Sequence, residues 1–250
     1  MFPTNQSFGN SVVLAAAARL PQPLFPPTIP GYVQPWLGQE SSTSDHPRGV
    51  PAFVWGPAAR ERRHRAGYRN HTPIGAPWLY LLALEANSAI PVPPVRKALL
   101  PPEPEPNRLL YFPHHGLQGE LAARRTAIAL GSQAPETTIA LTHEQAASEA
   151  TRRAYEDVGA RVVDLGPARQ EVGSVAPFFL QRILQLIRVH RSVRTDVVGT
   201  YALFAHSAGA IVEAHVPRER LDALVERELG PSCVMPAQEL RAIFDWSTHV

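Results

Sequence analysis

Short apolar runs alternate with amphipathic stretches along the second half of the chain. The predicted strands are apolar or β-branched runs at residues 109–113, 137–142, 161–165, 192–195 and 210–214. The predicted helices lie between and after these runs, at residues 148–158, 177–190, 199–207, 220–229 and 236–245. Strands that alternate with helices are typical of βαβ units with right-handed crossovers. The pattern therefore predicts an α/β fold, with a Rossmann-like parallel sheet that carries helices on both faces.

The first half of the chain predicts fewer elements and contains two clusters of proline. Its predicted elements are strands at residues 52–55 and 72–74, helices at residues 60–66 and 78–86, and a short buried strand or helix at residues 11–18. Proline lacks a backbone N–H, so the clusters at residues 21–51 and 91–106 exclude helix interiors and central strands. We therefore expect residues 1–106 to form a short Pro-rich lobe with its linker, and residues 107–250 to form the Rossmann-like domain.

Charge and composition exclude several classes of protein. The 24 basic and 22 acidic residues nearly cancel, and the only dense basic run, at residues 60–65, is typical of a solvated helix face, so nucleic acid is not an expected partner. Contact of this run with a phosphate or with an anionic lipid headgroup at a membrane surface is left open. No apolar run reaches the length of a membrane span, and no basic segment precedes residues 11–18 as in a signal peptide. With one cysteine, Cys233, the sequence fits a reducing compartment, and we expect a cytoplasmic protein.

A Gly-Thr pair follows the strand predicted at residues 192–195. Gly199 and Thr200 open the next helix, where free N–H groups and the helix dipole favour a phosphate group. The structural alternative is an ordinary helix start that Thr195 or Asp196 caps. Because a carboxylate at this place would repel a phosphate, we expect Asp196 to cap the helix or to face away.

Histidines and acidic residues follow three other predicted strands. His114 and His115 come after the first strand, at the edge where parallel α/β sheets bind ligands, and at least one of them is a candidate general acid or base. The alternative is one surface histidine and one packed histidine. No metal site is expected, because no third ligand stands at a diagnostic spacing.

His143, Glu144 and Glu213 also stand at strand ends and are candidates for binding a base, a ribose or a sugar. For Glu144 the structural alternative, an acidic residue at the start of a helix, is favoured about two to one. The segment around Ser207 does not match the Gly-x-Ser-x-Gly pattern and lies at the predicted end of a helix, so serine hydrolase chemistry is not expected.

Five segments occur in an order that resembles a known group. They read IGAPWLYLL, LLYFPHHG, TTIALTHEQ, YEDVGARVVDLG and FFLQRILQLIRVHRSVRTDVVGTYALFAHSAGAIVEAH, and the proline-rich connector separates the first two. Over about residues 50–246 the chain thus resembles bacterial polysaccharide-biosynthesis proteins that are similar to GT-B-type glycosyltransferases. In that pattern Ser-Asn precedes the nucleotide-binding helix; here Arg194, Thr195 and Asp196 stand instead, while Gly199 and Thr200 match.

The resemblance implies a GT-B-like architecture whose later half binds a nucleotide-sugar, with a hydroxyl acceptor in the interdomain cleft. The expected reaction is glycosyl transfer in polysaccharide or glycoconjugate biosynthesis, without a metal or other cofactor. His114 or His115 would be the catalytic group, and Gly199 and Thr200 would hold the diphosphate. Two alternatives remain open: a sugar-nucleotide epimerase on the same fold, and a non-catalytic relative that binds a partner protein.

Overall fold

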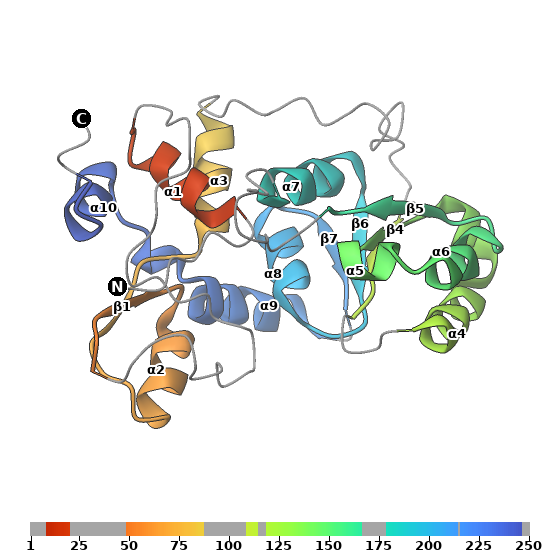
Figure 1. Ribbon diagram of the computed structural model, residues 1–250, viewed down its shortest axis with the longest axis horizontal. Helices are drawn as coiled ribbons and strands as arrows, with labels where there is room; N and C mark the ends of the chain where they lie inside the picture. Colours follow the sequence, from red (N-terminus) through yellow and green to blue (C-terminus); the bar gives the residue numbers. More distant parts are fainter. Residues whose placement is uncertain are drawn as a thin grey trace. The chain divides into compact units, whose positions relative to one another are not determined.

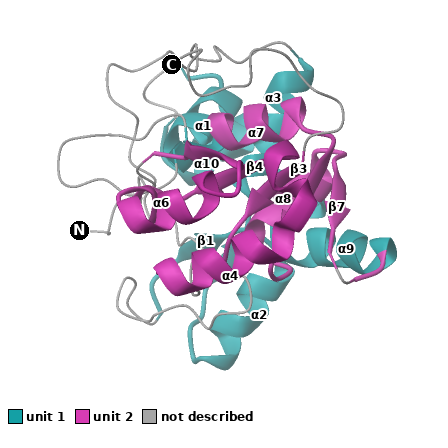
Figure 2. Cartoon of the chain, turned by 90° about the vertical axis from the view of Figure 1, so that its right-hand side faces the viewer, with its two compact units in different colours: residues 1–91, 169–180, 218–250 teal, residues 92–168, 181–217 magenta. Residues whose placement is uncertain are grey.

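The computed structural model describes residues 9–20, 49–87, 109–114, 119–166, 179–214 and 216–246. By its internal contacts the chain divides into two compact units, shown in different colours in Figure 2. The first unit contains residues 1–91, 169–180 and 218–250, and the second contains residues 92–168 and 181–217. This grouping differs from the division expected at residue 106, because it places residues 218–250 with the amino-terminal part. The predicted proline-rich connector lies outside the described residues.

Five parallel strands form the sheet of the second unit (Figure 1). They are β3 (Leu109–Phe112), β4 (Thr137–Leu141), β5 (Arg161–Asp164), β6 (Ser192–Thr195) and β7 (Ile211–Glu213). Their order across the sheet is β5-β4-β3-β6-β7, and each neighbouring pair runs parallel. The predicted α/β class and the predicted parallel sheet are therefore confirmed, with each strand within two residues of its expected bounds.

Helices α4 and α6 cover one face of this sheet. The helices of the second unit are α4 (Glu120–Leu130), α5 (His143–Ala146), α6 (Glu149–Glu156), α7 (Phe179–Val189, in this unit from residue 181 on) and α8 (Thr200–Ser207). Tyr111, Ile139 and Leu141 point to the same side of their strands and share one apolar core with residues of α4 and α6. The sequence analysis did not predict α4, because its buried side chains are mainly the small Ala123 and Ala127.

Helices α7 and α8 cover the opposite face. Thr138 and Phe112 alternate with the side chains named above and therefore point to this side. The Thr138 hydroxyl lies 2.9 Å from Nε2 of His190, which follows α7 directly. The Phe112 ring stacks on the ring of Tyr201 in α8, with 4.5 Å between the centroids. Helices on both faces bury the sheet, as its all-parallel strands require.

The strand order reverses between β3 and β6. From β3 the chain moves to β4 and β5 on one side, then crosses back to β6 and β7 on the other. In open parallel sheets, a reversal of this kind sends the connections that follow the two strands in opposite directions. This switch point is where ligands bind in open parallel sheets.

The first unit is built around a small parallel β-α-β arrangement. Its elements are α1 (Asn10–Ala17), β1 (Ala52–Val54), α2 (Pro57–Arg65), β2 (His71–Pro73), α3 (Pro77–Ala86), α9 (Arg218–Leu224), the π-helical turn η5 (Val225–Leu229), the 3-10 turn η6 (Pro231–Cys233) and α10 (Ala237–Ile243). The apolar run at residues 11–18 forms a helix, which settles the strand-or-helix alternative. The single helix predicted at residues 220–229 is α9 followed by η5.

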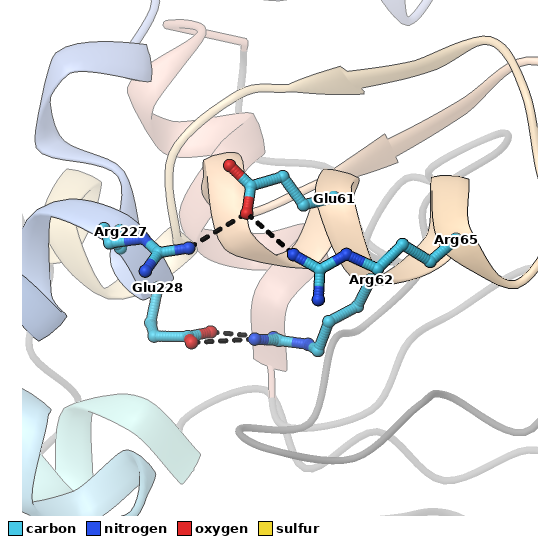
Figure 3. A network of polar contacts seen from close by, with 5 residues as sticks. All are labelled: Glu61, Arg62, Arg65, Arg227 and Glu228. Atoms are coloured by element: carbon cyan, nitrogen blue, oxygen red, sulfur yellow. Dashed lines mark hydrogen bonds and ion pairs between the residues drawn. The ribbon is translucent and has the colours of Figure 1, made fainter.

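The turn between β1 and α2 packs closely against η5. Gly56 leaves so little space that a Cβ atom there would lie 2.4 Å from the Arg227 carbonyl oxygen. The Arg62 guanidinium donates two hydrogen bonds of 2.7 Å to the Glu228 carboxylate, and Glu61 forms an ion pair of 2.9 Å with Arg227 (Figure 3). Close backbone approach and a bidentate ion pair thus fix η5 on α2. Within the described ranges, no helix is long and apolar enough to cross a membrane.

Candidate functional site

The structure places the predicted site residues along one edge of the sheet in the second unit. His114 follows β3, His143 and Glu144 begin α5 after β4, Gly199 and Thr200 follow β6, and Glu213 ends β7. Because the five strands are parallel, their carboxyl ends share this edge. His115 lies outside the described residues. The predicted set is therefore brought to one side of the sheet, and its members differ in the partners they have there.

The start of α8 is free of side-chain capping. Gly199 is the N-cap residue, no side chain caps the helix, and no acidic residue stands in its first turn. A Cβ atom on Gly199 would meet only Val197 atoms at 3.9 Å, so the space in front of the helix start is open within the described part of the chain. The first N–H groups of a helix lack partners inside the helix and carry the positive end of its dipole. This helix start is therefore suited to an anion.

Asp196 is held away from this helix start. One of its carboxylate oxygens accepts a short hydrogen bond from the Tyr111 hydroxyl, and the other accepts from the backbone N–H of His114 at 2.8 Å. Burial raises the pKa of Tyr111 far above its ordinary value, and the bond to Asp196 raises it further, so the phenol remains a donor. The expectation that Asp196 caps the helix or faces away is confirmed: it faces β3. These bonds also tie the ends of β3 and β6 together across the switch point.

A hollow of about 530 Å³ opens beside the switch point. Its lining residues are Arg194, Thr195, Asp196, Glu213 and Ala214. The Arg194 guanidinium donates to the Glu213 carboxylate from both Nε, at 2.9 Å, and Nη2, at 2.5 Å. Glu213, predicted to bind a ribose or a sugar, is thus neutralised by Arg194, which the sequence indicated only as a departure from the Ser-Asn pattern. A carboxylate accepts several hydrogen bonds, so this pairing leaves room for a ligand hydroxyl.

His143 and Glu144 stand near β5 and α8 respectively. Nδ1 of His143 lies 3.1 Å from the Asp164 carboxylate, and both side chains are about half exposed. Glu144 lies in the first turn of α5, which Thr142 caps, in agreement with its structural interpretation. Its carboxylate also acts on Tyr201: burial, and secondarily this negative charge, raise the pKa of that phenol. A binding role for either residue stays a prediction.

Several site residues were missed by sequence reasoning. In the sequence, Tyr111 is one residue of an apolar run that predicts a strand. Arg194 and Asp164 are polar residues near the ends of other short predicted strands. Only the strand order places Tyr111 against Asp196, and Arg194 beside Glu213. The position of Asp196 directly after a strand was the one signal in the sequence that pointed to these contacts. Sequence analysis interpreted this residue only as a helix cap or as a side chain that faces away from the helix.

The described residues contain no cluster of three or more His, Cys, Asp or Glu side chains that could hold a metal ion. The edge therefore combines an uncapped helix start with carboxylates that have partners of their own. Neither a protein-family model, nor a curated protein, nor a solved structure matches this chain.

Proposed function

We propose that this chain is a GT-B-type glycosyltransferase, which transfers a sugar from a nucleotide-activated donor to a hydroxyl acceptor. The observation that carries the proposal is the start of α8, which stands uncapped at the carboxyl edge of a sheet with a switch point between β3 and β6. This strand order is the Rossmann-like order, and the edge is where such sheets bind nucleotides.

The diphosphate of the donor would lie on the first turn of α8. Backbone N–H groups and the helix dipole there stabilise negative charge, and Gly199 lets a phosphate approach the backbone. Charge on the departing nucleoside diphosphate grows during the reaction, so fixed dipoles at this place lower the barrier. Asp196 supports this arrangement because its carboxylate is bound to Tyr111 and His114 instead of the helix start.

The hydroxyl groups of the donor would meet the carboxylates of the neighbouring hollow. Asp196 and Glu213 each keep acceptor capacity beyond the bonds they make, and Arg194 offsets the charge of Glu213. Hydroxyl groups of a ribose or a sugar are the donors that such oxygens accept. His114 stands at the same edge and is our candidate general base for the acceptor hydroxyl.

The first test is the substitution Gly199→Val in a thermal-shift panel of UDP-, GDP-, CMP- and dTDP-sugars. One of these donors, at a concentration of a hundred times its Kd, is expected to raise the melting temperature of the parent chain by roughly 5–10 °C. In Gly199→Val the side chain covers the helix start, so this response is lost. The melting temperature without ligand is expected to stay near the parent value, because φ of Gly199 is −120° and the space is open.

Ala210→Val, at the opposite end of α8, is the matched control and is expected to respond like the parent. A Gly199→Val variant that keeps the full nucleotide response would show that the diphosphate does not lie on α8. No response of the parent chain to any of the four donors would contradict the proposal itself and favour a non-catalytic relative.

Product analysis with a labelled nucleotide-sugar distinguishes transfer from epimerisation. A transferase releases the nucleoside diphosphate when a hydroxyl acceptor is present and forms a labelled glycoside. An epimerase converts the sugar while it is still attached to the nucleotide, and it needs no acceptor. Conversion of the donor in the absence of acceptor would therefore replace our proposal with the epimerase alternative.

A further inference from the structure

The first unit contains a hollow of its own, unrelated to the edge of the large sheet. Its volume is about 750 Å³, within the usual range of small-molecule sites. One side is the exposed face of α2 and the other is the segment from η6 to the start of α10. Its lining residues are Pro57, Arg60, Glu61, His64, Arg65, Pro73, Ser232, Cys233, Val234, Met235 and Glu239.

The wall formed by residues 232–235 is fixed in place by its own contacts. The buried Tyr80 hydroxyl accepts a hydrogen bond of 2.8 Å from the Met235 N–H and donates one of 2.5 Å to the Ile74 carbonyl oxygen. The Ser232 hydroxyl donates a short bond to the Glu226 carboxylate. Since this wall is held in place by these bonds, binding a ligand would cost little ordering entropy.

Two cationic or proton-bearing side chains of α2 line the hollow and have no partner among the residues that the structure describes. Arg60 and His64 stand one helical turn apart, and within the described ranges no hydrogen bond or ion pair engages either side chain. The neighbouring charges of this face have partners: Glu61 lies 2.9 Å from Arg227 and 3.7 Å from Arg65. Figure 3 shows these three side chains together with the Arg62–Glu228 pair. Arg60 and His64 are thus left to bind something else.

We propose that this hollow binds a sugar phosphate, with the phosphate group on Arg60 and His64. The guanidinium fork matches phosphate oxygens, and an imidazole beside it adds a further donor. The Glu239 carboxylate and the Ser232 hydroxyl line the same hollow and can accept hydrogen bonds from sugar hydroxyls. The carboxylates of Glu61 and Glu239 beside the cations disfavour a polyanion such as nucleic acid, whereas they suit a ligand with one phosphate and several hydroxyls.

Cys233 makes the test direct, because it is the only cysteine of the chain and lines the hollow. The rate at which its thiol reacts with DTNB is measured on the folded, full chain with glucose 6-phosphate, with inorganic phosphate and with glucose. Glucose 6-phosphate at nine times its Kd is expected to slow the reaction about tenfold, because a tenth of the sites stay free. Inorganic phosphate is expected to protect at higher concentration, and glucose at equal concentration is expected to leave the rate unchanged.

The variant that tests the assignment is Arg60→Gln combined with His64→Gln. Both side chains are exposed, so the fold is expected to persist, and the unprotected thiol rate of the variant checks this. Protection by glucose 6-phosphate should disappear in this variant and persist in the control Arg124→Gln, which removes an exposed arginine of α4. The proposal is overturned if no phosphate protects the thiol, if glucose protects as well as its phosphate, or if the double variant is protected like the parent.

Discussion

Between pH 10 and pH 12 the second unit is expected to lose roughly 4 kcal/mol of its free energy of unfolding, through Tyr111 and Tyr155 alone. Burial raises the pKa of Tyr155 to about 12, and burial together with the bond to Asp196 raises the pKa of Tyr111 further. Both residues are 2% exposed, so solvent does not screen this effect. The loss approaches the whole stability of an ordinary domain.

The sign follows from proton counting. In the unfolded chain a tyrosine loses its proton near pH 10, whereas these two keep it in the fold. Above pH 10 the unfolded state therefore binds fewer protons, and stability falls by at most about 1.4 kcal/mol per pH unit for each tyrosine. Below pH 10 both states hold the proton, so these phenols cause no pH dependence there.

Urea unfolding at pH 10, 11 and 12, followed by circular dichroism and by phenolate absorbance, measures this slope. Tyr155→Phe is expected to reduce it by about 1 kcal/mol per pH unit, since one phenol no longer titrates in the unfolded state. Phenolate absorbance should rise together with loss of the fold. Full ionisation of the tyrosines near pH 10 while the circular dichroism stays native would contradict the prediction.

Gly56→Ala is expected to destabilise the first unit by about 3 kcal/mol, the upper part of the usual range for overpacking. The added Cβ atom would lie 2.4 Å from the Arg227 carbonyl oxygen and 2.8 Å from that of Glu228. These are backbone atoms of η5, so the methyl group is accommodated only if α2 and η5 separate. Separation would also stretch the paired hydrogen bonds between Arg62 and Glu228.

Gly199→Ala provides a matched control for this substitution. Gly56 and Gly199 are both N-cap residues with extended backbone, at φ −122° and −120°. An alanine at Gly199 meets nothing closer than 3.9 Å, so we expect its free energy of unfolding to change by less than about 0.5 kcal/mol. Equal effects of the two substitutions, measured by urea unfolding, would show that close packing against η5 is not what Gly56 provides.

Much of the secondary structure could be predicted from local pattern. The strands at β3 and β4 are short apolar or β-branched runs, and α7 repeats its apolar residues every three or four positions. Helix α4 was not predicted because its buried positions are mainly alanine, while the larger Leu121 and Ile128 are exposed. The apolar stripe that would indicate a helix is therefore weak. The grouping of residues 218–250 with the first unit had no local signal, since it depends on contacts distant in sequence.

The candidate site was predictable in its position but not in its partners. Placing Gly199, His114 and Glu213 at one edge needed only the expectation that the strands are parallel. That Asp196 is bound by Tyr111, and Glu213 by Arg194, depends on which strands are neighbours. Strand order cannot be derived from the hydrophobic pattern, because a short apolar or β-branched run indicates that a segment is a strand and does not indicate which strands lie beside it.

The amino-acid sequence by itself determined the class of fold, the approximate bounds of its strands and the open helix start at Gly199, because these follow from side-chain periodicity and backbone preference within a few residues. The tertiary structure decided which charges are neutralised, which phenols are buried and that α2 faces η5 across Gly56. The physical reason is distance along the chain: pairs such as Arg62 and Glu228, 166 residues apart, acquire their energies only when packing brings them together.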